Sequence, residues 1–349
     1  MKTSVCASAL LCVILVQCVA TGGTRISGIE LPHRRHGNPQ EVPSQNRPLI
    51  GILSQPGDGM GYSLTSTGGL EKPVPPGYST SYIAASYVKF VEMGGARAVP
   101  LIWNEPEETL RKKFSAINGI LFPGGGTSLK DSPFFRVADK LFNWAIEAND
   151  RGDHFPIYGV CLGFELLSVI VSKNHDILEP FHAENNPGPL LFVGDSAKHE
   201  GMFKWIPLNI IDELYEQKLT MQNHKWGLSP EKWISTPELN DFFQILTVTP
   251  DLNEKLYVST VEAREYPILG VQWHPEKNAF EWGIDNIPHS ADAIRITQSV
   301  ANFLIAEARK STHTPSSFKE EQDFLIYNHA PVYTGKEGKG TFDQAYVFN

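Results

Sequence analysis

The chain has 349 residues, of which 41% are hydrophobic and 20% charged, an ordinary composition for a globular protein that buries a sizeable core. Its formal net charge of −9 argues against a nucleic-acid-binding protein, because such proteins carry basic stripes on their surface. A small anionic substrate is still compatible with this charge, because it needs only a few well-placed positive or polar groups in one pocket.

Residues 1–22 have the features of a secretory signal peptide. Lys2 forms a short positive region, an apolar stretch runs from Val5 to Val16, and small residues follow up to Ala20. The apolar stretch is too short for a good membrane span, so we expect no membrane partner, and an uncleaved signal anchor is the less favoured alternative. The sequence therefore predicts entry into the secretory pathway, with the vacuole or the extracellular space and cell wall as destinations.

Two further segments border the expected domain. Residues 23–46 are polar and punctuated by Gly and Pro, which predicts a flexible lead-in or a propeptide. Residues 47–349 are expected to form a single domain, because 48–310 contain no internal repeat and no clear linker. The C-terminal tail, about 318–349, is expected to wrap the surface of that domain.

Strands and helices alternate in the first half of the expected domain. Short apolar runs predict strands, and segments with apolar residues at helical spacing predict helices. Such alternation predicts a mostly parallel central sheet covered on both faces, which is a three-layer α/β sandwich. The strands are expected at 49–53, 98–102, 119–122 and 157–160, and the helices at 81–92, 106–114, 134–149 and directly after Cys161.

The alternation ends beyond residue 185. Apolar runs at 243–248, 256–261 and 268–273 are separated by turns, and they predict an antiparallel extension of the same sheet. A last helix is expected near 291–308. Ligands of open α/β sheets bind outside the carboxyl ends of the strands, where the glycine triplet 124–126 and Cys161 are both expected.

Cys161 is the only cysteine outside the expected signal peptide, since the other three are Cys6, Cys12 and Cys18. An unpaired cysteine in a secreted protein indicates an intermolecular disulfide or a reactive thiol, although an inert buried cysteine is also common. Here a Gly-x-Cys-x-Gly turn separates an apolar strand from an amphipathic helix. The beginning of a helix lowers the pKa of a thiol, so this position favours a nucleophile.

A cysteine nucleophile also needs donors for the oxyanion and a base. The Leu162 backbone N–H and a glycine amide of 124–126, which we place at Gly125, are the candidate donors. His274 follows an apolar strand, and Glu276 lies two residues further on, where an extended chain would place it on the same side as His274. Glu276 would then orient the imidazole, although an incidental strand-end histidine carries about equal weight.

At this point the sequence resembles the class I glutamine amidotransferases and, within them, the gamma-glutamyl hydrolase family. The resemblance runs from about Pro48 to the C-terminus, and the extended tail together with the lack of Asn-x-Ser/Thr glycosylation acceptors points to a plant member. It is carried by Ser81-Tyr-Ile-Ala-Ala-Ser-Tyr-Val-Lys89, Phe122-Pro-Gly-Gly-Gly126, Cys161-Leu-Gly-Phe-Glu165, Asn223-His-Lys-Trp-Gly-Leu-Ser229, and Gly270 through Glu276 with Glu281-Trp282.

The resemblance implies a flavodoxin-like fold and hydrolysis of gamma-glutamyl amides in folyl or antifolate poly-gamma-glutamates through a cysteine acyl-enzyme. It implies Cys161 as nucleophile, His274 as general base and then acid, and Glu276 as orienter. His224 is implied as a residue near the substrate, with Glu165 ranked below it because it is equally explained as a structural carboxylate. No metal and no cofactor are implied.

Two other classes remain open from the sequence. One is a glutaminase-type amidotransferase subunit, which would share the catalytic motif, and the other is a secreted binding or storage protein without catalysis. We expect a small-molecule substrate and neither nucleic acid nor membrane as a partner, and we allow for a homodimer. We also expect a thiolate–imidazolium pair between Cys161 and His274 that persists at acidic pH.

Overall fold

The computed structural model describes residues 25–26, 29–30, 46–57, 80–335 and 342–348. The chain divides into two units, Met1–Val42 and Pro43–Asn349. In the first unit the described residues are two short strands, β1 (Arg25–Ile26) and β2 (Ile29–Glu30), which pair in antiparallel fashion. The expected signal peptide lies outside the described residues, as does most of the expected lead-in.

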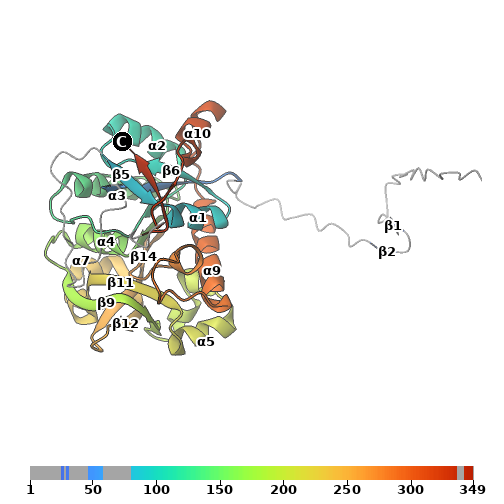
Figure 1. Ribbon diagram of the computed structural model, residues 1–349. Helices are drawn as coiled ribbons and strands as arrows, with labels where there is room; N and C mark the ends of the chain where they lie inside the picture. Colours follow the sequence, from blue (N-terminus) through green and yellow to red (C-terminus); the bar gives the residue numbers. More distant parts are fainter. Residues whose placement is uncertain (1–24, 27–28, 31–45, 58–79, 336–341, 349) are drawn as a thin grey trace, which may run out of the picture. The chain divides into compact units, whose positions relative to one another are not determined.

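A mixed eight-stranded sheet forms the centre of the second unit, and β6, β12 and β14 are labelled in Figure 1. Its strand order is β10-β12-β13-β14-β8-β7-β3-β6. The strands from β14 to β6 are parallel to one another, and β13, β12 and β10 continue the sheet in antiparallel pairs. The bounds are β3 (Leu49–Leu53), β6 (Arg97–Leu101), β7 (Ile120–Phe122), β8 (Ile157–Val160), β10 (Leu191–Phe192), β12 (Phe243–Pro250), β13 (Leu256–Ala263) and β14 (Ile268–Val271).

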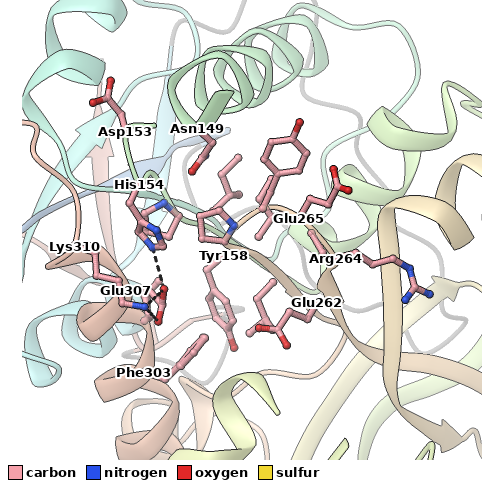
Figure 2. Close-up of a pocket in the computed structure, with 18 of the residues that line it drawn as sticks. Asn149, Asp153, His154, Tyr158, Glu262, Arg264, Glu265, Phe303, Glu307 and Lys310 are labelled. Atoms are coloured by element: carbon pink, nitrogen blue, oxygen red, sulfur yellow. Dashed lines mark hydrogen bonds and ion pairs between the residues drawn. The ribbon is translucent and has the colours of Figure 1, made fainter. Parts of the chain in front are cut away.

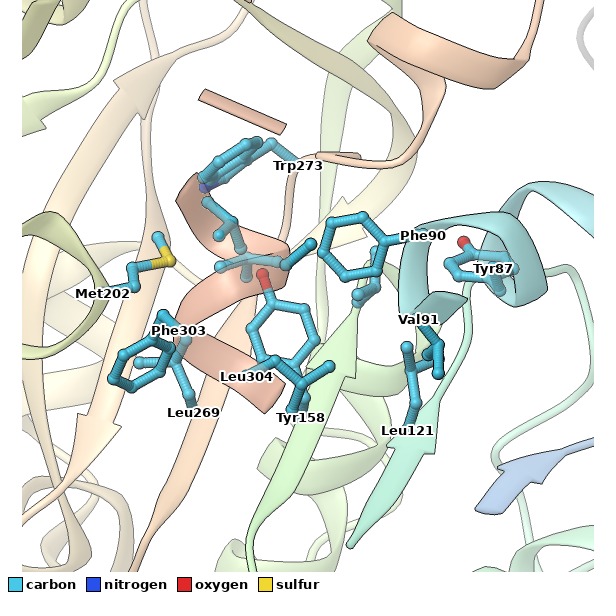
Figure 3. Packing of buried hydrophobic residues seen from close by; sticks show 14 of the residues in the cluster. Tyr87, Phe90, Val91, Leu121, Tyr158, Met202, Leu269, Trp273, Phe303 and Leu304 are labelled. Carbon is cyan, nitrogen blue, oxygen red and sulfur yellow. The ribbon is translucent and has the colours of Figure 1, made fainter. Parts of the chain in front are cut away.

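Helices contribute to two separate hydrophobic clusters that share this sheet, as a three-layer sandwich requires. Figure 3 shows one of them, in which Phe90 and Val91 of α1 meet Tyr158 of β8 and Phe303 of α9. The other cluster combines α2, α3 and α4 with the same strands. The helices are α1 (Ala85–Met93), α2 (Glu107–Ala116), α3 (Pro133–Asp150), α4 (Leu162–Ser172), α5 (Leu208–Glu216), α6 (Pro230–Ile234), α7 (Pro237–Phe242), α8 (Lys277–Phe280), α9 (Ala291–Ala308) and α10 (Phe318–Phe324), with 3₁₀ turns at Asp195–His199, Gly201–Trp205 and Ile326–Asn328.

The two longest described helices begin where the sequence provides a capping side chain. Ser132 accepts a hydrogen bond from the Phe135 amide at the start of α3, and Pro133 occupies the first helical position, where no amide hydrogen is needed. Ser290 accepts a hydrogen bond from the Ala293 amide at the start of α9 in the same way. Both helices lie within two residues of their predicted bounds.

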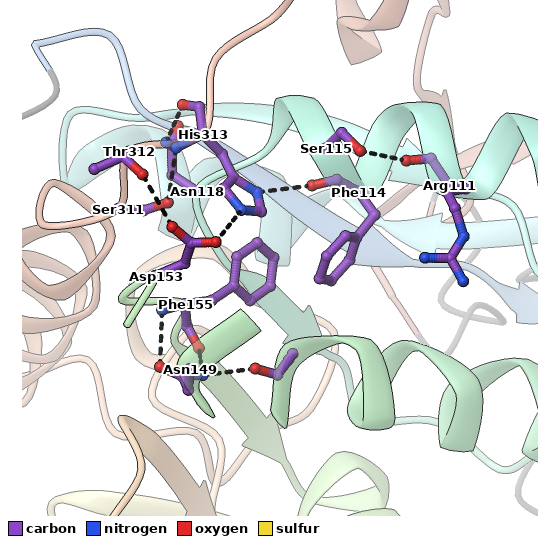
Figure 4. A network of polar contacts seen from close by, with 11 residues as sticks. Arg111, Phe114, Ser115, Asn118, Asn149, Asp153, Phe155, Ser311, Thr312 and His313 are labelled. Carbon is purple, nitrogen blue, oxygen red and sulfur yellow. Dashed lines mark hydrogen bonds and ion pairs between the residues drawn. The ribbon is translucent and has the colours of Figure 1, made fainter. Parts of the chain in front are cut away.

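A polar network joins the chain after α9 to the sheet (Figure 4). The Asn118 side chain accepts a hydrogen bond from the Leu49 amide at 2.8 Å and donates one to the His313 carbonyl at 2.8 Å. The His313 ring in turn packs edge-on against Phe114 of α2. The start of β3 is thereby tied to a segment far away in the sequence, which holds the amino end of the sheet in place.

The antiparallel extension is confirmed, but one of its three expected strands also belongs to the parallel part. β14 pairs in antiparallel fashion with β13 and in parallel fashion with β8. The carboxyl ends of β8 and β14 therefore lie side by side. This neighbourhood brings the segment after Val271 next to Cys161, which immediately follows β8.

Two predicted segments differ from the structure. The expected helix 81–92 begins with a strand, β5 (Ser81–Ala84), and the tail is not a surface wrap, because β16 (Gln344–Phe348) pairs with β5. With β4 (Gln55–Pro56) and β15 (Val332–Tyr333) they form a second sheet. The tail is drawn in because Phe342 and Phe348 are buried.

A third sheet was not predicted. It consists of β9 (Glu179–Gly188) and β11 (Thr220–Gly227), which pair in antiparallel fashion with a register shift at His224. Apart from 336–341 and 349, the chain beyond residue 80 is described throughout, and no helix in that part is long and apolar enough to cross a membrane.

Candidate active site

Cys161 lies at a sharp turn between β8 and α4. Its backbone has φ +51° and ψ −106°, a conformation that costs a non-glycine residue on the order of 1–3 kcal/mol. The turn is held by hydrogen bonds on both sides, because the Cys161 amide donates to Val271 O at 2.8 Å and its carbonyl accepts from the Glu165 amide at 3.0 Å. The strain therefore persists at the point where the thiol is presented.

The two glycines of the Gly-x-Cys-x-Gly turn are required by close packing. A methyl group at Gly163 would overlap the backbone carbonyl oxygen of Phe122 in β7, and one at Gly159 would lie 2.7 Å from Gly163 O. Helix α4 thus approaches the strands more closely than any larger residue would permit. The sequence signal for the elbow has a direct steric cause.

His274 and Glu276 form a buried hydrogen-bonded pair. Nδ1 of His274 lies 2.7 Å from Oε1 of Glu276, and both side chains are almost completely buried. The contact was expected, but the reason given for it was wrong. Glu276 is not in an extended segment, because it has φ −71° and ψ −29° as the residue that precedes α8.

Gly124 packs closely against both Cys161 and His274. A methyl group at this position would be 3.2 Å from Cys161 Cβ and 2.9 Å from His274 Cε1. The Gly124 amide donates to the Tyr87 hydroxyl at 2.8 Å, and that hydroxyl lies 3.4 Å from His274 Nδ1. Tyr87 therefore joins the glycine loop to the His274–Glu276 pair. From the sequence it was only a helix-face residue, and nothing local to it indicated this contact.

Two backbone amides remain as candidate oxyanion donors. The Leu162 amide donates toward the Cys161 sulfur, and within the described part of the chain the Gly125 amide has no acceptor. Gly125 is held by the Gln55 side chain, which would lie 2.8 Å from a methyl group placed there. The structure thus brings Gly125 and Leu162 to the rim of the same pocket as Cys161.

His224 lines that pocket from β11. Its Nδ1 donates a hydrogen bond to the Trp226 carbonyl at 2.8 Å, so in the neutral ring Nε2 carries no proton and can only accept. Among the described residues Nε2 has no hydrogen-bond partner. Burial lowers the pKa of His224 to about 3, because the ring has lost water that would stabilise its charged form. His224 is therefore a neutral hydrogen-bond acceptor in the pocket.

Glu165 lies in the first turn of α4 and also lines the pocket. Burial raises the pKa of this carboxyl group to about 8, so it is uncharged at neutral pH. Its Oε1 accepts a hydrogen bond from Gln272 Nε2 at 3.1 Å, which links α4 to the segment after β14. If Glu165 were a structural carboxylate that holds the glycine loop 124–126, it would hydrogen-bond that loop, but its side-chain hydrogen bond among the described residues goes to Gln272.

The protonation states of the thiol and the imidazole differ from the expected thiolate–imidazolium pair. Burial raises the pKa of Cys161 well above its ordinary value, and negative charge on Glu165, once it ionises, and on Glu276 adds to this effect, which outweighs the lowering by Lys277 and the Leu162 amide. Burial lowers the pKa of His274, although Glu276 opposes that effect. At neutral pH these shifts favour a neutral thiol, a neutral imidazole and an ionised Glu276, whose own pKa His274 keeps below its usual value against the effect of burial.

These groups share a pocket of about 470 Å³, the size of a small-molecule site. It lies at the carboxyl ends of β8 and β14, as the sequence predicted. The residues that matter most for its chemistry are Cys161, Leu162, Glu165, His224, His274 and Lys277. No group of at least three His, Cys, Asp or Glu side chains in the described residues has an arrangement that would hold a metal ion.

A larger cavity of about 870 Å³ lies at the opposite end of the sheet (Figure 2). It is bordered by Ile157 and Ile268 at the amino ends of β8 and β14, and by an ion pair in which His154 lies 2.9 Å from Glu307. It has no cysteine among its lining residues. Since ligands of open α/β sheets bind at the carboxyl ends, the pocket with Cys161 is the candidate active site.

Comparison with known proteins agrees with this site. The profile of the class-I glutamine amidotransferase family matches residues 79–290, a range that includes Cys161, His224, His274 and Glu276. Gamma-glutamyl hydrolase 1 of Arabidopsis thaliana is 50% identical over 303 residues, covering 86% of this chain and 83% of that protein. The gamma-glutamyl hydrolase of Glycine max is 43% identical, covering 96% of each chain, and that of Homo sapiens is 37% identical, covering 97% and 98%. This chain therefore belongs to the gamma-glutamyl hydrolase family, which the class-I glutamine amidotransferase domain also indicates.

Proposed function

We propose that this protein hydrolyses gamma-glutamyl amide bonds in folyl or antifolate poly-gamma-glutamates through a covalent acyl-enzyme. The single observation that carries the chemistry is the packing at Gly124, where a methyl group would lie within 3.2 Å of both Cys161 Cβ and His274 Cε1, while His274 is hydrogen-bonded to Glu276. The substrate class is supported by the relatives named gamma-glutamyl hydrolase in plants and animals.

In this reaction the neutral His274 takes the thiol proton as the Cys161 sulfur attacks the gamma-carbonyl carbon. The oxygen becomes negatively charged, and the Gly125 and Leu162 amides stabilise it. The protonated imidazole then gives its proton to the leaving amine, and the carbon–nitrogen bond breaks. In the second half His274 removes a proton from water, which attacks the thioester and releases the glutamyl product and the thiol.

Glu276 and His224 have supporting roles in this proposal. Glu276 holds the Nδ1 proton of His274, so that Nε2 is the basic atom, and its negative charge stabilises the transient imidazolium. His224 Nε2 accepts a hydrogen bond from a substrate N–H, because it is a bare acceptor in the pocket. Its low pKa keeps it in this form even in an acidic compartment.

Turnover of pentaglutamyl folate tests the proposed function. We expect release of glutamate or of gamma-linked glutamate peptides, with a kcat/KM far above that for hydrolysis of free glutamine. Product analysis by mass spectrometry also gives the cleavage position. Equal or greater activity on glutamine would instead favour the glutaminase reading, and no turnover together with an unreactive Cys161 would favour a non-catalytic binding or storage protein.

The pH dependence of Glu276→Gln tests the role of the carboxylate. In the native enzyme, burial places the pKa of His274 below its ordinary value, so the imidazole stays neutral and kcat/KM is expected to stay near its maximum at pH values somewhat below about 6.5. Removing the negative charge of Glu276 destabilises the imidazolium, so the acidic limb shifts to still lower pH while kcat falls roughly 100-fold or more. The exposed Glu108→Gln is the matched control and should leave the profile unchanged. An acidic limb that moves to higher pH would contradict the assigned role.

The cellular setting is part of the proposal. We place the protein in the secretory pathway, with the vacuole or the extracellular space and cell wall as its destination, because of the apolar leader in residues 1–22. We further propose a small-molecule substrate, no nucleic-acid or membrane partner, and a homodimer as the oligomer to test first. A fluorescent fusion at the C-terminus and sedimentation of the purified chain measure these two properties.

A further inference from the structure

Lys277 is a buried cation in the candidate active-site pocket. It follows Glu276 at the start of α8, only 1% of its surface is exposed, and its side chain lines the pocket. Among the described residues, no acceptor hydrogen-bonds its Nζ and no carboxylate lies within 4.0 Å of it. A buried ammonium group without a partner is costly, so its place in a substrate pocket requires a reason.

The other charged groups of the pocket are paired or neutral. Lys225 forms an ion pair with Glu184 at 3.4 Å, and Lys130 forms one with Asp176. Glu165 is uncharged at neutral pH, because burial raises its pKa to about 8. Lys277 is thus the cation in the described pocket that is left to bind an anion.

Neighbouring side chains hold Lys277 without neutralising it. Its Nζ lies 5.1 Å from the centre of the Phe342 ring, within the range of a cation–π contact. Glu281 is near enough to interact with it electrostatically, but that carboxylate accepts a hydrogen bond from the Asp343 amide at 2.7 Å. The ammonium group is therefore oriented by the Phe342 ring, and no hydrogen bond to a described residue prevents it from binding an anion.

We infer that Lys277 binds the alpha-carboxylate of the glutamyl residue whose gamma-carbonyl is attacked by Cys161. The inference rests on the proposed function, because every glutamyl residue of a poly-gamma-glutamate carries this carboxylate. Only the Cα, Cβ and Cγ atoms separate it from the reacting carbonyl, so its binding site must lie close to the nucleophile. Lys277 meets that condition, since its charge acts on Cys161, His274 and Glu276.

The C-terminal segment takes part in this site. Phe342 lies outside the range 79–290 that matches the class-I glutamine amidotransferases, and β16 holds it over the pocket by pairing with β5. Tyr82 of β5 supports the Phe342 ring, with ring centres 5.9 Å apart. The segment that was expected to wrap the surface thus positions the carboxylate-binding lysine, and Phe342→Leu should produce a smaller loss of the same kind as removal of Lys277.

Two substrates separate carboxylate binding from a structural role. One is folyl-gamma-diglutamate, and the other is its analogue with an alpha-carboxamide on the acyl-donor glutamate. For the native enzyme we expect kcat/KM to be roughly 10- to 100-fold lower on the analogue, as for loss of a hydrogen bond to a charged group. Lys277→Met should lower kcat/KM on the carboxylate substrate by a similar factor, mainly through KM, and should lower it much less on the carboxamide analogue. Lys277→Arg should recover part of the loss, and the exposed Lys112→Met should change neither substrate.

The outcomes distinguish the inference from the proposed function. If the native enzyme cleaves folyl-gamma-diglutamate and Lys277→Met lowers kcat/KM equally on both substrates, Lys277 does not bind the alpha-carboxylate, and the proposed function stands. If the native enzyme cleaves neither substrate, the proposed function fails and the inference falls with it.

Discussion

Cys161→Ala is expected to lower kcat on a folyl poly-gamma-glutamate by roughly 10⁴-fold or more, because the covalent route requires the sulfur. His274→Ala should cost a comparable factor, since the thiol in this buried site is neutral and attacks only when a base removes its proton. The double variant should lose little more than either single variant, because the two groups act as one unit. Single-turnover rates on a pentaglutamyl folate measure all three.

Controls for this prediction follow from the structure. Alanine keeps the Cβ atom at φ +51°, so the thermal midpoint of Cys161→Ala should stay within a few degrees of the native value. A mild thiol electrophile should label Cys161, and the labelling should slow in His274→Ala. Cys161 is the only cysteine outside the expected signal peptide, so a protein that lacks residues 1–22 can be labelled at one site only. Additive losses in the double variant would show that His274 does not activate the thiol.

Gly163→Ala is expected to lower the free energy of unfolding by about 3 kcal/mol, at the upper end of the usual range for overpacking. The added methyl group would overlap the Phe122 carbonyl oxygen, and the obstacle is backbone rather than a flexible side chain. Helix α4 must then move away from β7. Urea denaturation followed by tryptophan fluorescence gives the change in unfolding free energy.

The same displacement should impair catalysis in whatever fraction remains folded. Cys161 and Leu162 precede Gly163 directly, so a shift of α4 moves both the nucleophile and one oxyanion donor. Gly283→Ala is the matched control, because a methyl group there would meet no atom closer than 3.9 Å. A Gly163→Ala protein with native stability and native kcat would show that the close approach of α4 to β7 is not required.

The sequence by itself determined the secondary structure around the sheet and the position of the candidate nucleophile. Apolar runs and helical spacing are local properties, so β3, β7, β8, α3 and α9 could be located within two residues. The sharp turn at Cys161 could also be recognised from the local sequence, because the Gly-x-Cys-x-Gly pattern includes Gly163, where only glycine fits beside the neighbouring strand. For the same reason Leu162 and the glycine loop could be predicted as candidate oxyanion donors.

Glu276 was predicted to lie beside His274, but the predicted backbone geometry was wrong. Residues 81–84 were predicted to be helical and form a strand instead. In both cases contacts across the chain outweigh the local pattern. Ser81–Ala84 is extended because β16 and β4 pair with it on either side, and these partners lie far away in the sequence. The turn at Glu276 depends equally on where α8 packs.

What only the tertiary structure decided is which distant segments meet at the pocket and what charge each group carries there. β14 lies beside β8, which places His274 next to Cys161 although 113 positions separate them in the printed sequence. Tyr87, Lys277 and Phe342 join the site through the same long-range packing. Burial then raises the pKa of Cys161 and lowers those of His274 and His224. A sequence pattern records which side chains are available, whereas the loss of water around them is a property of the whole fold, so the direction in which burial shifts the pKa of Cys161 follows only from the structure.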